Sequence, residues 1–320
     1  AGDDRYGSIS YDEAIGQFYC QWLTDAGSGT YCNGNGSGIN KFFPAPGNHD
    51  YSDGGGINEY LSYFTLPGAG VASSSTSGNE RYYDFIQGDV HFFMLDSDAA
   101  IGSSSDRTAQ QNWLQTQLAA STSNWKVVIL HHAPYSSANH GNNSTMQWPY
   151  ATWGADVVMA GHDHTYERIH RNGIVYIVNG LGGKSIYNFG TPVSGSQVRY
   201  NSDYGAVKAS VDGDTMNIQF INTSGTVIDD HDIVKSVNPP NDGVVDVQIS
   251  QSLDDVEERT SDGAIDSGSS DIELGDDPGF NEDQTVGLLF RNISIPQGAN
   301  ITSAYLEFEV DEIDTATSNV

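Results

Sequence analysis

The sequence predicts an α/β domain followed by a smaller, incomplete all-β region, and three observations support this division. In the first part of the chain, short apolar runs alternate with one candidate helix. Polar clusters rich in histidine follow several of these runs. After a Pro-Pro pair the sequence turns acidic and no helical pattern is recognisable. Alternating strands and helices are typical of an α/β sheet, whereas strands without helices indicate an all-β module.

Five apolar runs are interpreted as buried strands, because they are short and bounded by polar or turn residues. They span 41–43, 90–95, 126–130, 156–160 and 174–178. A helix is expected over 106–120, where Leu114 and Leu118 have helical spacing and Ser105 is placed to cap it. From 204 to 234, alternating residues with Asp-Gly and Ser-Gly turns predict an antiparallel meander.

The Pro-Pro pair predicts a domain boundary. We expect a catalytic-type domain over 1–234, a linker over 235–243 and a partial β-sandwich over 244–320. In this last region, 284–295 and 304–310 are interpreted as strands.

Charge limits the classes of partner. Lys and Arg total 13 against 42 Asp and Glu, giving a net charge of −29, which argues against binding nucleic acid through a basic face. An anionic substrate would need local positive charge, and a bound metal ion can supply it. The sequence contains no apolar run of the roughly 18 residues that a membrane helix needs.

Cys20 and Cys32 are the two cysteines of the chain. They are close enough in sequence to close a small disulfide loop, with two unpaired thiols as the alternative. A disulfide together with the acidic composition favours a secreted, periplasmic or otherwise extracellular protein.

Three polar clusters, at 48–50, 131–132 and 162–164, are interpreted as following the ends of strands. Ligands of open α/β sheets bind just beyond the carboxyl ends of the strands, so these clusters are expected to converge. His162 and His164 lie two residues apart, and an extended segment would put both rings on one side, with Gly161 turning the chain below them.

The remaining candidate ligands are less specific. One of His131 and His132 is expected to bind metal, with a core or supporting role for the other. Asn48 offers a neutral oxygen to a hard cation, and His49 next to it would donate a proton or contact phosphate. Near the start, Asp3 offers a bridging carboxylate and Tyr6 a phenolate suited to ferric iron.

Four motifs occur in a specific order: Gly-Asp-x-x-Tyr at 2–6, Gly-Asn-His-Asp at 47–50, Val-x-x-His at 128–131 and Gly-His-x-His at 161–164. This order resembles the calcineurin-like metallophosphoesterases, and the tyrosine points to their purple acid phosphatase branch. The resemblance covers roughly 1–234. It implies the four-layer αββα sandwich of that family and a dinuclear centre of Fe(III) with a divalent Fe, Zn or Mn ion.

The resemblance also implies individual roles. Asp3 would be shared by both metals, while Tyr6 and His164 would bind the ferric ion. The divalent ion would be bound by Asn48, His131 and His162. Two histidines, His49 and His140, would contact phosphate or protonate the leaving group, and two residues, Asp50 and His132, would support the ligands from behind. His140 has a plain surface role as its alternative.

The implied activity is hydrolysis of small phosphate monoesters by hydroxide that the two metals generate from water. Two alternatives stay open: a phosphodiesterase or nucleotidase on the same fold, and a non-catalytic surface or adhesion protein with a relic phosphoesterase domain. The family has an Asp-bearing strand before Gly-Asp-x-x-Tyr, so the chain as given is expected to lack one ligand and to be inactive by itself. The stretch 291–306 resembles jelly-roll accessory modules, which implies contact with carbohydrate or a cell surface; a structural spacer is the alternative.

Overall fold

The computed structural model describes residues 9–23, 29–32, 40–68, 75–235, 247, 249, 255–266, 276–277, 282–290 and 303–306. The chain divides into two compact units, Ala1–Lys235 and Ser236–Val320. No helix in the described part is long and apolar enough to cross a membrane.

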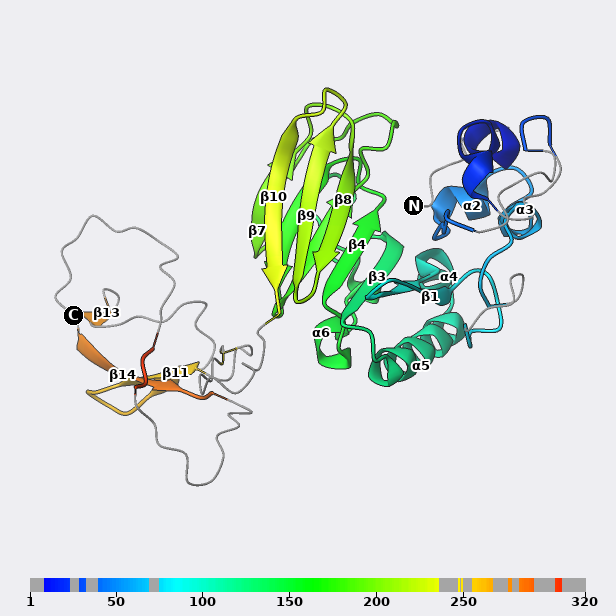
Figure 1. Ribbon diagram of the computed structural model, residues 1–320. Coiled ribbons are helices and arrows are strands. Elements are labelled where there is room, and N and C mark those ends of the chain that lie inside the picture. Colours follow the sequence, from blue (N-terminus) through cyan, green and yellow to red (C-terminus); the bar gives the residue numbers. More distant parts are fainter. Residues whose placement is uncertain are drawn as a thin grey trace. The chain divides into compact units, whose positions relative to one another are not determined.

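A seven-stranded mixed sheet forms the centre of the first unit (Figure 1). Its inner strands pair in parallel, β2 with β3, β3 with β4 and β4 with β6, while β1 and β5 run antiparallel to their neighbours. The carboxyl ends of the parallel strands therefore meet at one edge. In spatial order the strands are β1 (Tyr83–Gln87), β2 (Val90–Met94), β3 (Trp125–His132), β4 (Val157–Gly161), β6 (Ile174–Asn179), β5 (Tyr166–Arg171) and β7 (Ser196–Tyr200).

A three-stranded antiparallel sheet packs against this large sheet and confirms the predicted meander. It consists of β8 (Gly205–Asp212), β9 (Thr215–Asn222) and β10 (Val227–Val234). Alternate residues of β9, including Ile218 and Phe220, are fully buried and share a core with Val127, Val157 and Ile177 of the large sheet. Burying the apolar face of each sheet against the other is what holds the two layers together.

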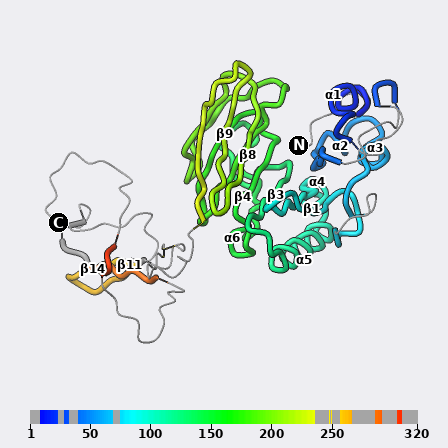
Figure 2. Tube along the Cα trace, viewed as in Figure 1, coloured from blue at the N-terminus to red at the C-terminus, as the bar shows by residue number. Residues whose placement is uncertain are grey.

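Helices cover the opposite face of the large sheet. These are α4 (Ser97–Gly102), α5 (Ser104–Ala120) and α6 (Tyr150–Trp153), and Figure 2 shows α5 and α6 on the side away from β8 and β9. Leu114 and Leu118 of α5 pack on Val128 and Val158. The predicted α/β class is thus confirmed. In the described residues, the outer face of the three-stranded sheet is largely exposed and carries no fourth, helical layer.

The expected cap of the long helix was wrong by two residues. The Oγ atom of Ser103, and not Ser105, accepts the backbone N–H of Asp106 at 3.2 Å. Ser105 lies inside the first turn of α5. Both serines fit the capping preference by residue type, but Ser103 has the extended backbone of an N-cap residue, with φ −140° and ψ 123°, whereas Ser105 is helical.

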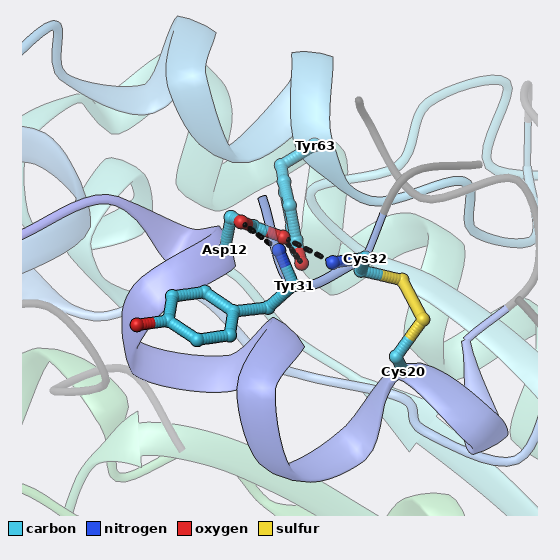
Figure 3. The surroundings of a disulfide bond; sticks show 5 residues. All are labelled: Asp12, Cys20, Tyr31, Cys32 and Tyr63. Atoms are coloured by element: carbon cyan, nitrogen blue, oxygen red, sulfur yellow. Dashed lines mark hydrogen bonds between the residues drawn. A yellow bond between two sulfur atoms is a disulfide. The ribbon is translucent and has the colours of Figure 1, made fainter. Parts of the chain in front are cut away.

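The segment before the large sheet is built from short helical turns and a disulfide. The turns are η1 (Asp12–Gly16), α1 (Gln17–Tyr19) and η2 (Cys20–Trp22), followed by α2 (Asn48–Ser52) and α3 (Ile57–Tyr63). One further turn, η3 (Ser144–Met146), lies outside this segment and follows β3. Cys20 and Cys32 are bonded, which settles the alternative left open by the sequence. The buried carboxylate of Asp12 accepts the N–H groups of Tyr31 at 2.8 Å and Cys32 at 2.7 Å, which fixes the closed loop (Figure 3).

Residues 41–43 do not form the expected strand. Pro44 and Pro46 follow immediately and donate no backbone hydrogen bond, which disfavours a sheet ladder. The aromatic rings serve packing: Phe43 stacks on Phe85 with centroids 3.7 Å apart. As a consequence, the polar cluster at 48–50 begins a helix and does not follow a strand.

The second unit contains a four-stranded antiparallel sheet in the order β12-β11-β14-β13. Its strands are β11 (Asp255–Arg259), β12 (Ile265–Asp266), β13 (Asp276–Asp277) and β14 (Glu282–Leu288). The strand predicted over 284–295 corresponds to β14 as far as Leu288; the next two residues, 289–290, are not in a strand, and 291–295 lies outside the described residues. Of the strand predicted over 304–310, the described residues 304–306 are not in a strand, and the rest lies outside the described part.

Candidate metal centre

The first turn of α2 places Asn48 and His49 at the edge where the parallel strands end. Asp50 holds this turn: its Oδ2 accepts the backbone N–H of Gly47 at 2.7 Å, as in a capping box, and its Oδ1 accepts the hydroxyl of Tyr11. Asp50 is 3% exposed, so its carboxylate supports the helix from the protein side. This geometry favours the predicted role of Asp50 as a residue that supports the ligands, and we keep that role as a proposal.

His131, near the end of β3, meets donor atoms from two other elements. Its Nε2 lies 2.7 Å from Oδ1 of Asn48 and 3.0 Å from Nδ1 of His162. These three side chains come from a helix, a strand and a loop that are far apart in sequence. The predicted convergence of the clusters therefore takes place on one point.

His132 points into the same region. The potential ligand atoms of His131, His132 and His162 all lie within 4.8 Å of one another. The Nδ1 atom of His132 is 2.9 Å from Oγ of Ser97, which also accepts the backbone N–H of His132 at 3.0 Å. Ser97, at the start of α4, thereby fixes the orientation of this ring.

The chain between β4 and β5 is bent and not extended, which corrects the expected geometry of His162 and His164. His162 itself adopts a left-handed φ of 68°, so the sharp turn is at the histidine and not at Gly161. The chain must leave β4 and return in the opposite direction along β5, on the far side of β6. A non-glycine residue held in this conformation is strained and is typical of functional sites.

His164 is oriented by the loop after β6. A carbonyl oxygen only accepts, so Nδ1–H of His164 donates to the carbonyl of Ser185 at 2.7 Å. This fixes the tautomer and makes Nε2 the acceptor nitrogen of the ring. The Tyr187 ring stacks on His164 at 4.1 Å between centroids. On the back of the bend, Gly180 approaches so closely that a Cβ there would lie 2.2 Å from the carbonyl oxygen of Asp163.

The two histidines predicted to contact substrate lie around this group. His140 stacks on the ring of His162, with centroids 4.0 Å apart and planes inclined by 28°. Nδ1 of His49 lies 3.0 Å from Oδ2 of Asp53, which orients that ring. Asp3 and Tyr6 lie outside the described residues, so their predicted roles stay predictions.

Burial and crowding keep two of these imidazoles neutral. Burial first, and then the neighbouring His132 and His140 among others, lower the pKa of His162 to about 3. Burial and His140 lower the pKa of His132 to about 4. Neutral imidazole is the form that coordinates a metal. Converging neutral ring nitrogens beside an amide oxygen are a donor set that fits a transition-metal ion.

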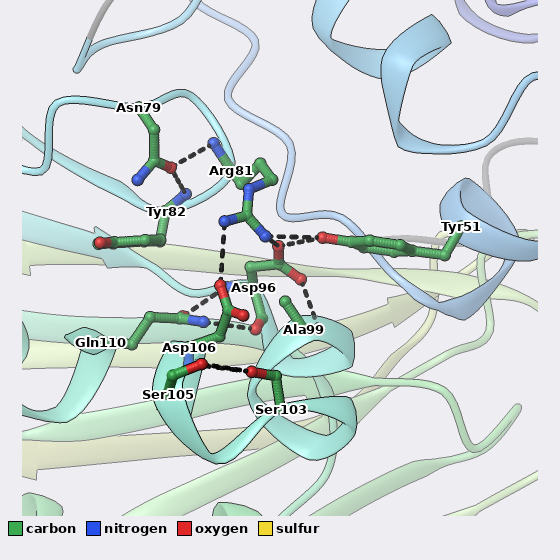
Figure 4. Close-up of polar contacts among 10 residues, drawn as sticks. All are labelled: Tyr51, Asn79, Arg81, Tyr82, Asp96, Ala99, Ser103, Ser105, Asp106 and Gln110. Carbon is green, nitrogen blue, oxygen red and sulfur yellow. Dashed lines mark hydrogen bonds and ion pairs between the residues drawn. The ribbon is translucent and has the colours of Figure 1, made fainter. Parts of the chain in front are cut away.

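Sequence reasoning missed the network that holds α2 in place (Figure 4). The hydroxyl of Tyr51 donates to Oδ2 of the fully buried Asp96, and Nη1 of Arg81 reaches the same oxygen at 3.0 Å. Gln110 bonds both backbone groups of Asp96, at 3.0 and 2.9 Å. The available signal was the acidic residue directly after the apolar run 90–95, just as two histidines directly follow the apolar run 126–130.

Known families and proteins resemble this chain over the region just described. The family model described as calcineurin-like phosphoesterase matches residues 1–166, and the model described as iron/zinc purple acid phosphatase-like protein C matches 173–230. Purple acid phosphatase 15 of Arabidopsis thaliana is 34% identical over 158 residues, covering 43% of this chain and 28% of that protein. Human tartrate-resistant acid phosphatase type 5 is 30% identical over 112 residues, covering 29% of this chain and 34% of its own length.

An uncharacterised protein of Mycobacterium tuberculosis is 31% identical over 150 residues, covering 40% of this chain and 28% of that protein. The chain thus spans 28% to 34% of the length of these three relatives. Among solved structures, GAP50, the anchor in the inner membrane complex of Plasmodium, aligns with a TM-score of 0.50 at 20% identity, covering 61% of this chain and 67% of GAP50. That likeness concerns the fold alone. With the motifs at 47–50, 128–131 and 161–164 on one edge of the sheet and a family model covering residues 1–166, this chain belongs to the calcineurin-like phosphoesterase family, and its next stretch matches the purple acid phosphatase-like C-terminal model.

Proposed function

We propose that this protein hydrolyses phosphate monoesters at a dinuclear metal centre of the purple acid phosphatase kind. The observation that carries the proposal is the meeting of Asn48, His131 and His162 within 3.0 Å contacts at the carboxyl edge of the sheet. The family and its acid phosphatase relatives support the same chemistry. Because the chain covers only part of those relatives, its activity is inferred from the site and not transferred from them.

The residues divide between two ions. Asn48, His131 and His162 would hold a divalent Fe, Zn or Mn ion, and His164 with Asp3 and Tyr6 would hold Fe(III). When bound, such a pair supplies positive charge to the phosphoryl oxygens and lowers the pKa of water. This positive charge is needed because the chain itself carries −29.

The protein's own groups complete the site. His140 lies against His162, and His49 is close enough to help lower the pKa of His162, so both rings border the proposed centre. From there they would bind phosphoryl oxygens and deliver a proton to the leaving alkoxide. Asp53 keeps the His49 ring in place for that transfer.

We also propose that the protein works outside the cytoplasm. The bond between Cys20 and Cys32 supports this, since disulfides persist mainly in oxidising compartments. Detecting the protein in the culture medium or periplasm of its source, and not in the cytoplasm, would test this location.

The function is tested by elemental analysis of the full-length natural protein together with hydrolysis of p-nitrophenyl phosphate and bis(p-nitrophenyl) phosphate. We expect about two metal ions per chain, including iron, and faster hydrolysis of the monoester. His162→Ala should lose metal and activity, whereas His170→Ala should retain both, because His170 is exposed at the far end of β5. Preference for the diester would establish the phosphodiesterase alternative, and a folded protein without metal or activity would refute the proposal.

A further inference from the structure

Asp163 lies between the two candidate ligand histidines, yet its side chain serves a different segment. It is 1% exposed. Its Oδ1 accepts the backbone N–H of His140 at 2.8 Å, and its Oδ2 accepts the hydroxyl of Ser136 at 2.5 Å. Both partners belong to the loop that follows β3. The carboxylate therefore ties the loop bearing His140 to the bend bearing His162 and His164.

Ser136 extends this tie through the loop. Its Oγ accepts the backbone N–H of Ala138 at 3.1 Å, and its own N–H donates to Oδ1 of Asn142 at 3.0 Å. The turn is closed by a bond of 3.1 Å from the N–H of Gly141 to the carbonyl of Ala138. The backbone on both sides of His140 is thus fixed by bonds that lead back to one carboxylate.

A second buried carboxylate anchors the same loop at Ser137, between Ser136 and His140. Glu167, at the start of β5, is fully buried and accepts both the N–H at 2.7 Å and the hydroxyl of Ser137. A further donor is the hydroxyl of Ser196 at 2.6 Å. Glu167 fixes Ser137 to the sheet and makes none of these bonds to His140. The position of His140 itself therefore depends on Asp163.

The His140 side chain is exposed, while its N–H is held from below. An exposed side chain at a loop tip has many accessible orientations unless its backbone is fixed. Here the ring lies flat on His162 and 5.4 Å from the ring of Tyr187. Fixing the backbone reduces the conformational entropy that is lost when the His140 side chain adopts this single orientation.

We propose that Asp163 is a positioning residue that holds His140 over the metal centre, ready to contact the phosphoryl group of the substrate. This assignment rests on the proposed function for its catalytic consequence, but the restraint on the loop does not. A carboxylate suits the task because both of its oxygens accept, one from an amide and one from a hydroxyl. An asparagine of the same shape would turn one acceptor into a donor and lose one of the two bonds.

The test compares Asp163→Asn, His140→Ala and the double variant in the full-length natural protein. Asp156→Asn is the matched control, because Asp156 also accepts a backbone N–H, from Lys126 at 2.7 Å, but at the opposite end of β4. We expect Asp163→Asn to lower kcat/KM by about 10- to 100-fold through misplacement of His140. In the His140→Ala background the same change should have almost no further effect, because Asp163 acts through His140. Asp156→Asn should leave kcat/KM within about twofold of wild type.

Two readouts separate this inference from the function itself. Metal content should be unchanged in Asp163→Asn, and hydrogen–deuterium exchange of the metal-loaded protein should rise over 136–143, which needs no catalytic activity. Ser136→Ala, which removes one of the two bonds, should raise exchange in the same segment to a smaller extent. Loss of metal in Asp163→Asn, multiplicative kinetic effects in the double variant, or unchanged exchange over 136–143 would overturn the proposal. An inactive wild-type protein with faster exchange in the variant would refute only the proposed function.

Discussion

The two sides of the candidate metal centre are held by different kinds of interaction. On the α2 side, Tyr51 ties the helix to Asp96, and Asp96 pairs with the guanidinium of Arg81. On the side of the β4–β5 bend, His164 is fixed by a backbone carbonyl and Asp163 by a hydroxyl and an amide. One side therefore depends on a buried charge pair, whereas on the other side the buried carboxylate of Asp163 is held by uncharged donors.

This difference determines how much stability a mutation on each side should cost. Removing one member of a buried ion pair leaves a charge without compensation, which costs several kcal/mol. Removing one uncharged donor from a carboxylate that keeps another costs about 1.5 kcal/mol, the lower end of the range for hydrogen bonds to a charged group. The α2 side should therefore be sensitive to mutation of charges and to pH, and the bend should be more tolerant of either.

The largest expected effect comes from removing a ligand on either side. His162→Ala should lower kcat by at least about 1000-fold, beyond the 10- to 100-fold typical of residues behind the ligands. Asn48→Ala should have a smaller effect, because a neutral amide oxygen binds a transition metal more weakly than an imidazole nitrogen. Metal content and steady-state kinetics of both variants would check this order. A larger loss for Asn48→Ala would show that the α2 side dominates metal binding.

A stability effect should follow from breaking the charge pair. Arg81→Met should lower the free energy of unfolding by about 3 kcal/mol at pH 8, because Asp96 stays buried without its guanidinium. Arg107→Met is the control, since the guanidinium of Arg107 bonds the backbone carbonyl of Ala100, at 3.3 Å, and no carboxylate among the described contacts. Urea denaturation of both variants and of Arg81→Met/Asp96→Asn would measure the difference. Equal losses in the two single variants would remove the distinction between the two sides.

The pH dependence of Asp96 gives a further test. Burial, opposed by bonds from Tyr51, Ala99 and Arg81, raises the pKa of Asp96 from 3.8 to about 6. The folded state thus holds this proton more tightly than the unfolded state. The stabilisation is fully present below pH 4 and is lost as pH rises through 6.

Asp96→Asn cannot titrate, so the free energy of unfolding of wild type relative to this variant should fall by about 2 to 3 kcal/mol between pH 4 and 7. Metal-free protein should be used, so that metal loading does not change with pH. A difference that rises with pH would mean that the ion pair with Arg81 outweighs burial.

The smallest expected effect lies on the side of the β4–β5 bend. Ser136→Ala should lower the free energy of unfolding by about 1.5 kcal/mol, since Asp163 keeps its bond to the N–H of His140. Because no charge is exposed or stranded, this loss should be the same at pH 6 and pH 8. A loss as large as that of Arg81→Met would show that the bend is no more tolerant than α2.

The sequence predicted the parts of the fold that depend on hydrophobic continuity. The runs that became β2, β3, β4 and β6 are largely buried on both faces, and this produces a nearly continuous apolar pattern. The antiparallel meander was equally legible, because its buried residues alternate. The clustering of histidines followed directly from the direction of the parallel strands.

Other features depended on tertiary context. Phe42 and Phe43 read as a strand, but they pack against aromatic neighbours such as Phe64 and Phe85. The left-handed turn at His162 has no signal in residue type, since glycine is the expected residue in that conformation. Arg81 and Asp96 escaped notice because charged residues are usually exposed, and only the folded chain brings them together.

Gly180 sets a limit on how this protein can diversify. A methyl group there would lie 2.2 Å from the backbone oxygen of Asp163 and 3.0 Å from Cα of His164. Any heavier residue would have to displace the bend that carries both histidines, although position 180 itself contributes no side chain to the chemistry. In a library of random variants, this position should be nearly as intolerant as the ligands, and a screen for lost activity would then score a glycine as if it were catalytic.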